Sequence, residues 1–512
     1  MERRKLKGRT YKKLHCWPGL IVSFILLYFG FTGIIMNHRE FFAPIDINRK
    51  FLPTEYAYKN WNNSSFKGNL SITPDSVLIF GNLGIWLTDS LFENFEPFEN
   101  GLPKGSDNRK TFDILKTNNG HLYAATQFGL YAYEWEKKQW EKFDLDVSIK
   151  RFTAVECVND TVYAINRSYL FRGKSNGNKT NFEKIELDAP IGYINEVTLF
   201  KTIWQIHSGE IFGLPGKLFV DLLGLVTIFL SVTGIVYFFF PGIIVKRVKQ
   251  GKQFIKMASI NRWTLKWHNH IGEWTFVLLV ILYFTGMFLR PPMLIAIANS
   301  RVKPIKHSHL DQPNPWYDKL RDLLWDTETQ RFLLSTSDGM FYFDKNIYQP
   351  ELFSIQPPIS VMGINVFEPY TDGAFLIGSF SGLFLWHPNS PNIYDFATGE
   401  PYAGPGDGRP IGNFKVTGML TDHNKNRFMV DYDQGAIPLW HKATAPQMPQ
   451  SIIENSNISL WNFSLEMHTG RLFNFILGNF YILIVPLTSL AGVVVVISGY
   501  LLWRKKYRKT RK

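Results

Sequence analysis

Four long apolar runs punctuate the chain and predict membrane-spanning helices. They are Trp17–Met36, Leu222–Phe240, Ile271–Leu289 and Phe475–Trp503, and only the third contains a charged residue, Glu273. At about 1.5 Å per helical residue, each run can cross the roughly 30 Å of hydrocarbon in a bilayer. The first run is longer than the apolar core of a signal peptide, and no small-residue cleavage pattern follows it. We therefore interpret it as an uncleaved anchor.

The two polar segments between these runs, 41–205 and 291–465, carry a different pattern. An apolar strand, a turn with glycine or a small residue and an aromatic-rich strand follow one another six times. The six copies are Leu78–Trp86, Leu122–Tyr131, Val162–Phe171, Phe332–Tyr342, Phe375–Trp386 and Phe428–Trp440. A period of about 40–45 residues is typical of propeller blades. Three copies in each segment predict one six-bladed propeller built by both segments, and two separate β-sandwich domains are the alternative.

Basic residues are concentrated beside the apolar runs. Residues 1–13 contain seven lysines and arginines and one acid, and residues 241–267 and 504–512 each contain seven and no acid. These segments carry +20, so the rest of the chain carries −7 of the net +13. The positive-inside rule places both termini and the connector in the cytoplasm and both large segments outside. Membrane lipid is an expected partner, whereas nucleic acid is not, because the basic excess flanks membrane spans.

A histidine-marked pattern opens the first apolar run of each half of the chain. The stretch Lys13–Gly19 contains His15 and leads to a Thr-Gly pair at 32–33, and Lys266–Gly272 contains His268 and leads to a Thr-Gly pair at 285–286. In both halves the histidine precedes the threonine by 17 residues. This match indicates two related halves, about 1–250 and 251–512.

A second histidine-marked pattern precedes the second apolar run of each half. His207-Ser208-Gly209 in the first half matches His468-Thr469-Gly470 in the second. The glycine after each histidine allows a macrocycle to approach the backbone closely.

Two repeated histidines in each half suggest haem. A b-type haem takes two neutral imidazoles on opposite faces of its ring, supplied by facing helices. We expect His15 and His268 to bind one haem iron near the cytoplasmic side, and His207 and His468 to bind a second near the outer side. The alternatives are an interfacial polar role for the first pair and a structural cap for the second. Cations suited to haem propionates are Lys13, Arg262 and Lys266 inside, and Arg39 and Arg471 outside.

Two further histidines are alternate ligands. His270 could replace His268, although two residues along a helix turn a side chain by about 200°. His38, at the outer end of the first run, has no counterpart in the second half and could replace an outer ligand or lie near a substrate. Asp221 lies just inside the second run, where a carboxylate is costly. Asp221 could relay protons or pair with Lys217 one turn earlier, and we expect the pair.

Cysteine usage limits the type of haem. The chain has two cysteines, Cys16 and Cys157, on opposite predicted sides of the membrane, so they cannot form a disulfide with each other. No Cys-x-x-Cys-His sequence occurs, which excludes covalent c-type attachment.

The membrane portion resembles a known family. The pattern Leu14-His15-x-Trp17-x-Gly19-Leu20 with Thr32-Gly33 is similar to the opening helix of the PepSY-associated transmembrane family. The stretch from His207 through Asp221 to Thr233-Gly234 resembles its second helix. The family includes bacterial inner-membrane proteins of iron uptake, among them haem-containing ferric-siderophore reductases. The resemblance implies electron transfer through two haems to an iron complex outside. The β-rich segments depart from the family's PepSY modules, which leaves the substrate open.

The sequence thus predicts an α+β membrane protein with four transmembrane helices in two parallel-topology repeats and an extracytoplasmic all-β, six-bladed propeller-like domain. The expected function is oxidoreductase activity on a periplasmic ferric chelate, with electrons from a quinol or a cytoplasmic reductase. A transporter or sensor whose outer domain binds a ligand is the alternative. The predicted segments are 1–41, 42–205, 206–245, 246–267, 268–290, 291–465, 466–503 and 504–512.

Overall fold

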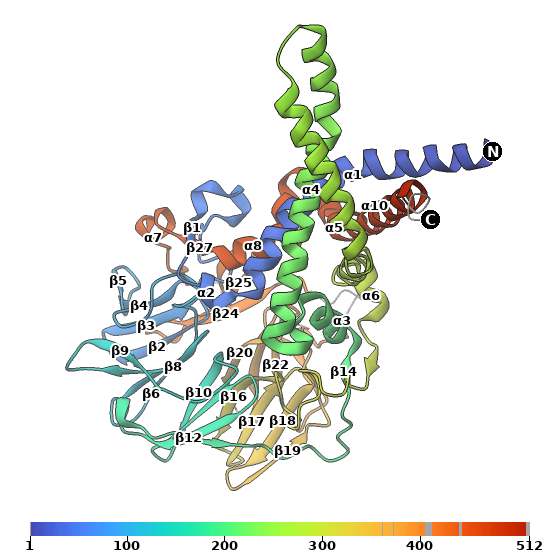
Figure 1. Cartoon of the computed structure of the whole chain (residues 1–512). Helices are drawn as coiled ribbons and strands as arrows, with labels where there is room; N and C mark the ends of the chain where they lie inside the picture. Colours follow the sequence, from blue (N-terminus) through green and yellow to red (C-terminus); the bar gives the residue numbers. More distant parts are fainter. Residues whose placement is uncertain (1, 361, 372, 405–411, 440–442, 508–512) are drawn as a thin grey trace. The chain divides into compact units, whose positions relative to one another are not determined.

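The computed structural model describes residues 2–360, 362–371, 373–404, 412–439 and 443–507 (Figure 1). The chain forms two compact units. A helical unit comprises Met1–Phe42, Asn195–Asp311 and Leu460–Lys512, and a β unit comprises Ala43–Ile194 and Gln312–Ser459. Two predictions fall partly outside the described residues: the end of the sixth strand pattern at Trp440, and residues 508–512 of the basic tail.

Four long helices make up most of the helical unit: α1 (Glu2–Asn37), α4 (Gly213–Lys249), α5 (Ile255–Met287) and α10 (Ile484–Tyr507). Helix α1 contacts α4 and α10, and α5 contacts the same two helices, so α1 and α5 lie diagonally opposite each other. A Cβ added at Gly30 of α1 would lie 3.1 Å from the Gly224 carbonyl oxygen of α4. Small residues therefore allow these two helices to pack closely.

The prediction of four membrane-spanning segments is confirmed by length and composition. The segments are Thr10–Asn37, Glu210–Lys249, Ile255–Met287 and Arg471–Lys505. The fourth apolar run is not one continuous helix, because α9 (Asn474–Leu477) and the 3-10 helix η6 (Gly478–Leu483) precede α10. The break falls at Gly478, which has a φ of 51°.

Short elements connect these helices. They are α2 (Arg39–Phe42), β14 (Val197–Thr198), α3 (Leu199–Ser208), η4 (Glu210–Phe212), α6 (Met293–Ile297), β15 (Arg301–Val302), α8 (Leu460–His468) and η5 (Arg471–Phe473). His207 and His468 were expected at the ends of the second and fourth spans, but they lie on the separate helices α3 and α8. The reason is local: Gly209 and Gly470, with φ of 78° and 77°, follow these helices in the left-handed conformation that ends a helix.

Among the described residues, the β unit contains five four-stranded antiparallel sheets, one three-stranded sheet and one two-stranded sheet. The strands of the first three sheets are β2 (Gly68–Thr73), β3 (Ser76–Gly81), β4 (Gly84–Asp89) and β5 (Phe95–Pro97); β6 (Thr111–Lys116), β7 (Leu122–Thr126), β8 (Gly129–Glu134) and β9 (Gln139–Lys142); and β10 (Phe152–Val158), β11 (Thr161–Asn166), β12 (Leu170–Lys174) and β13 (Glu183–Ile185). Those of the last three are β16 (Leu320–Asp326), β17 (Arg331–Thr336), β18 (Gly339–Asp344) and β19 (Ile347–Leu352); β20 (Ile364–Pro369), β21 (Phe375–Ser379), β22 (Gly382–Trp386) and β23 (Tyr394–Asp395); and β24 (Val416–Thr421), β25 (Arg427–Asp431) and β26 (Gly435–Pro438).

Five of the six predicted strand patterns form the central hairpin of a four-stranded sheet. The sixth forms the last hairpin of the three-stranded sheet, β25 and β26. The first strands of successive sheets contact one another from β2 through β6, β10, β16 and β20 to β24, and β24 contacts β2. The remaining elements of the β unit are β1 (Asp46–Asn48), η1 (Arg49–Phe51), η2 (Thr54–Tyr56), η3 (Gly177–Lys179), α7 (Gln450–Glu454) and β27 (Asn457–Ser459), and β1 pairs with β27.

The two chain segments of the β unit share their cores. One cluster contains Tyr163 and Ile165 of the third sheet together with Phe332 and Phe343 of the fourth. A second cluster joins the first sheet, the last sheet and α7. Each segment therefore buries apolar side chains against the other.

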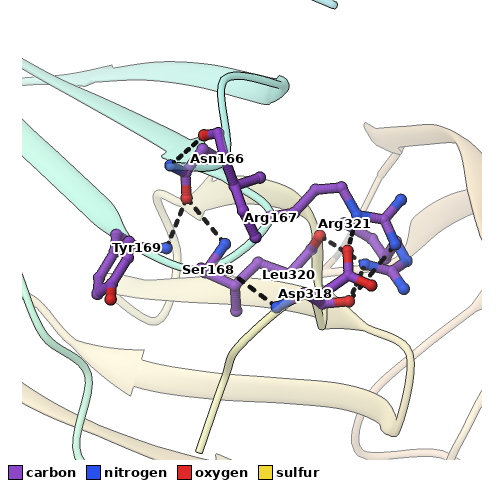
Figure 2. Close-up of polar contacts among 8 residues, drawn as sticks. Asn166, Arg167, Ser168, Tyr169, Asp318, Leu320 and Arg321 are labelled. Atoms are coloured by element: carbon purple, nitrogen blue, oxygen red, sulfur yellow. Dashed lines mark hydrogen bonds and ion pairs between the residues drawn. The ribbon is translucent and has the colours of Figure 1, made fainter. Parts of the chain in front are cut away.

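Polar contacts join the third and fourth sheets between the two segments (Figure 2). Arg167 donates from Nε to Asp318 Oδ1 at 2.5 Å, and the backbone N–H of Leu320 donates to the Arg167 carbonyl at 3.0 Å. Ser168 Oγ accepts from the Asp318 N–H at 2.9 Å. Asn166 Oδ1 holds the turn by accepting from the N–H groups of residues 168 and 169.

Candidate functional site

The structure brings together the first of the two predicted histidine pairs. His15 on α1 and His268 on α5 face each other across the bundle, with ring centroids 6.1 Å apart and ring planes at 70°. Both side chains are half-buried.

The second pair is also formed. His207 at the end of α3 and His468 at the end of α8 have ring centroids 6.5 Å apart and ring planes at 63°. The separation and the angle nearly repeat those of the first pair. Each pair takes one histidine from each half of the sequence, as the internal repeat predicts.

The Nδ1 atom of every one of these imidazoles has a hydrogen-bond partner on a long helix. The partners are Val495 O at 2.9 Å for His15, Thr233 Oγ1 at 2.9 Å for His268, Thr32 Oγ1 at 2.9 Å for His468, and Leu282 O at 3.0 Å with Thr285 Oγ1 at 3.2 Å for His207. The backbone of Leu230 also bonds His268, and that of Phe29 bonds His468. Bonds of this kind set the orientation of a metal-binding histidine.

These partners also decide which nitrogen carries the proton. Each threonine hydroxyl donates its single proton to the carbonyl four residues earlier, at 2.6 Å for Thr32 and 2.8 Å for Thr233 and Thr285. The hydroxyl oxygen must then accept from the imidazole Nδ1–H. A carbonyl, as at His15, can only accept. Every neutral imidazole of the two pairs is therefore protonated at Nδ1, and its Nε2 lone pair is free.

A glycine directly follows the hydroxyl residue and lies beside the imidazole in each case. A Cβ added at the glycine would lie within 3.5 Å of the histidine Cε1 atom. The distances are 3.5 Å for Gly33 and His468, 3.5 Å for Gly234 and His268, 2.8 Å for Gly286 and His207, and 2.6 Å for Gly499 and His15. Each histidine thus lies in a cradle formed by a Thr-Gly or Ser-Gly pair, and the four cradles are Thr32-Gly33, Thr233-Gly234, Thr285-Gly286 and Ser498-Gly499.

The alternate histidines lie elsewhere. The ring of His270 packs against Trp267 and Trp274, with centroids 5.8 and 4.3 Å away, and His268 takes the position beside His15. His38 is not part of either pair, because its Nε2 atom lies 2.6 Å from Asp221 Oδ2.

The expected ion pair between Asp221 and Lys217 is wrong. Asp221 accepts from Asn37 Nδ2 at 2.9 Å and contacts His38, both from the end of α1. Lys217 pairs instead with Glu210 at 3.2 Å. The reasoning from sequence considered only the neighbouring turn of the same helix, whereas the packed partner helix supplies better-placed groups.

The candidate cations fall into two groups. The three on the predicted inner side, Lys13, Arg262 and Lys266, are exposed. On the other side, the Arg39 guanidinium stacks 3.8 Å from the ring centroid of Trp461, and Arg471 pairs with Glu466 at 2.6 Å.

The functional residues that sequence reasoning missed are the cradles. The Thr-Gly pairs at 32–33 and 285–286 mark the repeat in the sequence but do not by themselves indicate a role. Ser498-Gly499 is a further copy of the same pattern. Their shared signal is a hydroxyl residue followed by glycine near one end of each long apolar run. Within the described ranges, no group of three or more His, Cys, Asp or Glu side chains is placed to hold a metal ion. Each site therefore offers two imidazoles as its metal-binding groups.

Family comparison agrees with the repeated architecture. The model of the PepSY-associated TM region matches residues 2–240 and again residues 241–506. The chain belongs to this family. The double match divides the chain at residues 240–241, within α4 and close to the boundary that the histidine repeat predicts. Members of the family are membrane proteins, in agreement with the four apolar helices.

Other comparisons add similarities of low identity. The extracellular domain of the two-component system BT4673 from B. thetaiotaomicron is 11% identical, with a TM-score of 0.34; the match covers 76% of this chain and 40% of that one. A protein of unknown function from Bacteroides thetaiotaomicron is 10% identical, with a TM-score of 0.33, over 77% of this chain and 71% of that one. PorZ of Porphyromonas gingivalis is 11% identical, with a TM-score of 0.29, over 77% and 39%. No curated protein matches the chain.

Proposed function

We propose that this PepSY-associated membrane protein binds two b-type haems, one at each histidine pair, and transfers electrons across the membrane. The observation that carries the proposal is the state of the four histidines. Each Nδ1 has a hydrogen-bond partner, and the two rings of each pair lie 6.1 or 6.5 Å apart. Nε2 is therefore the nitrogen with which each ring would bind a metal ion.

The spacing of the rings supports iron between them. An imidazole binds a metal ion through Nε2 at about 2.0 Å, and Nε2 lies about 1.1 Å from the ring centre. Two imidazoles that bind one metal ion from opposite sides would therefore have ring centroids about 6 Å apart. The observed 6.1 and 6.5 Å agree with this value. Because the protein supplies two ligands at each site, the other positions on the metal need a macrocycle, and haem with two axial histidines meets this requirement.

The glycines of the cradles make room for the imidazoles, because an added Cβ would lie 2.6–3.5 Å from each histidine Cε1. The imidazoles are half-buried, which leaves part of each ring accessible to a neighbouring ligand. The absence of Cys-x-x-Cys-His in the sequence makes the haem non-covalent. When bound, each haem supplies an iron centre that gains and loses one electron reversibly.

The two sites lie near opposite ends of the bundle. Helix α1 contributes His15 to the first pair and Thr32, the partner of His468, to the second. Their separation of 17 residues corresponds to about 26 Å along a helix. Between them lie the apolar side chains of Val22, Leu26 and Leu279. The interval between the two sites is therefore apolar.

We further infer that the β unit is a single six-bladed propeller. The support is the order of contacts between first strands, which passes through all six sheets and returns from β24 to β2. Hydrogen bonds of Asn69 with the backbone of Thr421, at 2.9 Å each, join the first and last sheets.

In this proposal the termini are cytoplasmic, the propeller is periplasmic, and the protein belongs to a bacterial inner membrane. Electrons enter at the pair formed by His15 and His268, from a quinol or a cytoplasmic reductase. They leave at the pair formed by His207 and His468, where a ferric chelate of the siderophore type is reduced. The family assignment and the basic flanks of the spans support this direction.

A visible absorption spectrum tests the proposal. We expect the purified, detergent-solubilised protein to show a Soret band, the spectrum of six-coordinate low-spin haem and two haems per chain. Substituting His15 or His268 by alanine removes one haem, and substituting His207 or His468 removes the other. His270→Ala is the matched control on α5 and leaves both haems bound. A protein expressed with ample haem that has no Soret band would contradict the proposal.

A further inference from the structure

Two arginines lie at the end of the bundle that holds the second histidine pair. Arg290 follows the end of α5, and Arg471 begins η5. Burial lowers the pKa of Arg290, and the positive charge of Arg471 lowers it further. Geometry agrees: the Tyr481 carbonyl oxygen lies 3.1 Å from a Cβ added at Gly470, the residue before Arg471, and the Tyr481 ring lies 6.0 Å from the Arg290 guanidinium. Both arginines are thus near the same tyrosine.

The nearby carboxylate balances only one of these charges. Glu466 Oε1 accepts from Arg471 Nη2 at 2.6 Å, and Arg471 Nε donates to Thr469 Oγ1 at 3.3 Å. The Arg290 guanidinium lies 6.0 Å from the ring centroid of Tyr481. A net positive charge thus remains on the two arginines.

Arg290 also has an unsatisfied donor. Its Nε atom is buried and has no hydrogen-bond partner in the part of the chain that the structure describes. A buried N–H of a charged group without an acceptor is unfavourable, so such groups are normally bonded. The missing partner is an acceptor with negative charge.

Both arginines are near residues of the second histidine site in the sequence, each just past the end of a helix, since α5 ends at Met287 and α8 at His468. Arg290 follows Gly286, which lies beside His207, by four residues, and Arg471 follows His468 by three. A guanidinium presents parallel N–H groups that match the two oxygens of a carboxylate.

We propose that Arg290 and Arg471 form a carboxylate-binding site at the edge of the second histidine pair. A carboxylate there accepts from Arg290 Nε and neutralises the excess charge. Haem carries two propionate carboxylates, so the proposed haem at this pair is one source of the ligand, and to that extent this inference rests on the proposed function. The carboxylate of a free iron chelate is the other source.

Arg290→Gln in the full-length, solubilised protein separates the two sources. If the ligand is a propionate, we expect the variant to lower the midpoint potential of the second haem, because a nearby positive charge favours the reduced iron. Arg290→Lys should restore part of the shift. If the ligand is a free carboxylate, the potential stays at its wild-type value and the Kd for the probe, ferric citrate, rises at least tenfold. Both results support the site.

Arg39→Gln is the matched control, since it removes an arginine that already stacks on Trp461. The inference is overturned if Arg290→Gln changes neither the potential nor citrate binding, or if Arg39→Gln changes them equally. A wild-type protein without haem would contradict the proposed function, and the citrate measurement alone would then decide the arginine site. Arg471→Gln is less useful, because it also leaves Glu466 without its ion pair.

Discussion

At the scale of single residues, the threonine hydroxyls determine the chemistry of the histidines they contact. A hydroxyl has one proton, and in Thr32, Thr233 and Thr285 a backbone carbonyl already takes it. The oxygen can then only accept from Nδ1–H, which leaves Nε2 as the nitrogen that would bind iron in the proposed sites. Replacing these hydroxyls would then change haem binding without altering the proposed iron ligands themselves.

We expect Thr285→Val to weaken haem binding at the second pair about tenfold, because partners of this kind contribute about 10- to 100-fold to metal affinity. The lower end applies, since the Leu282 carbonyl still accepts from His207. Haem titration of the apoprotein measures the change. Thr275→Val on the same helix is the control: its hydroxyl bonds only the Ile271 carbonyl, and its haem affinity should stay unchanged.

A second set of titratable residues lies in the β unit. Burial raises the pKa of Asp322 to about 7, an effect reduced by Lys67 and increased by Asp113. Burial also raises the pKa of Glu156 to about 7. These first-strand carboxylates are protonated in the folded protein at a pH where they ionise in the unfolded chain.

The β unit should therefore lose stability as the pH rises. A carboxyl group with a raised folded pKa stabilises the fold fully below its unfolded pKa of about 4, and the contribution declines as the pH rises to about 7. A tenfold difference in acid dissociation constant between the folded and unfolded states corresponds to about 1.4 kcal/mol of stability. We expect the Tm followed by circular dichroism to fall between pH 5 and pH 8, and Asp322→Asn to flatten the fall. The surface variant Asp344→Asn should keep the wild-type slope; equal slopes for all three proteins would refute the assignment.

At the scale of elements, the glycines of the cradles set how closely a histidine approaches a helix. The four positions are not equivalent. An added Cβ at Gly286 would lie 2.8 Å from His207, too close for a real contact, whereas at Gly234 it would lie at an ordinary 3.5 Å from His268.

We expect Gly286→Ala to abolish haem binding at the second pair, while Gly234→Ala leaves the first pair occupied. Haem-to-protein ratios measure both. Gly272→Ala, on the same helix as Gly286, serves as the control, since its Cβ would meet only Leu230 at 3.9 Å. That substitution should stabilise the helix by about 0.5–1 kcal/mol. Full haem content in Gly286→Ala would show that haem binding does not depend on the close approach of His207 to α5 at Gly286.

The elements also show what the sequence could and could not predict. The histidine pairs follow from the repeat, because equal spacing from His15 and from His268 implies equivalent positions in two packed halves. The partner of His15 does not follow, because Val495 lies 480 residues away and offers a backbone carbonyl, which leaves no side-chain signal. Arg290 could not be predicted for a related reason. Its proposed role depends on a buried Nε donor without an acceptor, and burial is known only once the chain is packed.

At the scale of the whole molecule, the β unit depends on both segments of the chain. Its core clusters take side chains from sheets on either side of the break, and Arg167 and Asp318 join them across it. Each segment alone would expose these apolar faces and the edges of its outermost sheets to solvent.

We expect residues 43–194 expressed alone to aggregate, and co-expression with residues 312–459 to give a soluble complex with one copy of each. Size-exclusion chromatography with light scattering measures the result. A monomeric first segment that unfolds cooperatively would favour two independent β domains over a shared propeller. The haem proposal would be unaffected, because it depends on the helical unit.

The four cradles belong to the opposite half of the sequence from the histidines they hold. Thr32-Gly33 and Thr233-Gly234 of the first half hold His468 and His268 of the second, and the second half holds His207 and His15 in return. The halves are therefore related as the subunits of a two-fold symmetric dimer. Two copies of a single half contain every ligand and every cradle, so the gene's ancestor could be half as long and still form both sites, between identical subunits. After such a duplication each copy is free to change on its own, and His38, which has no counterpart in the second half, is a difference of that kind.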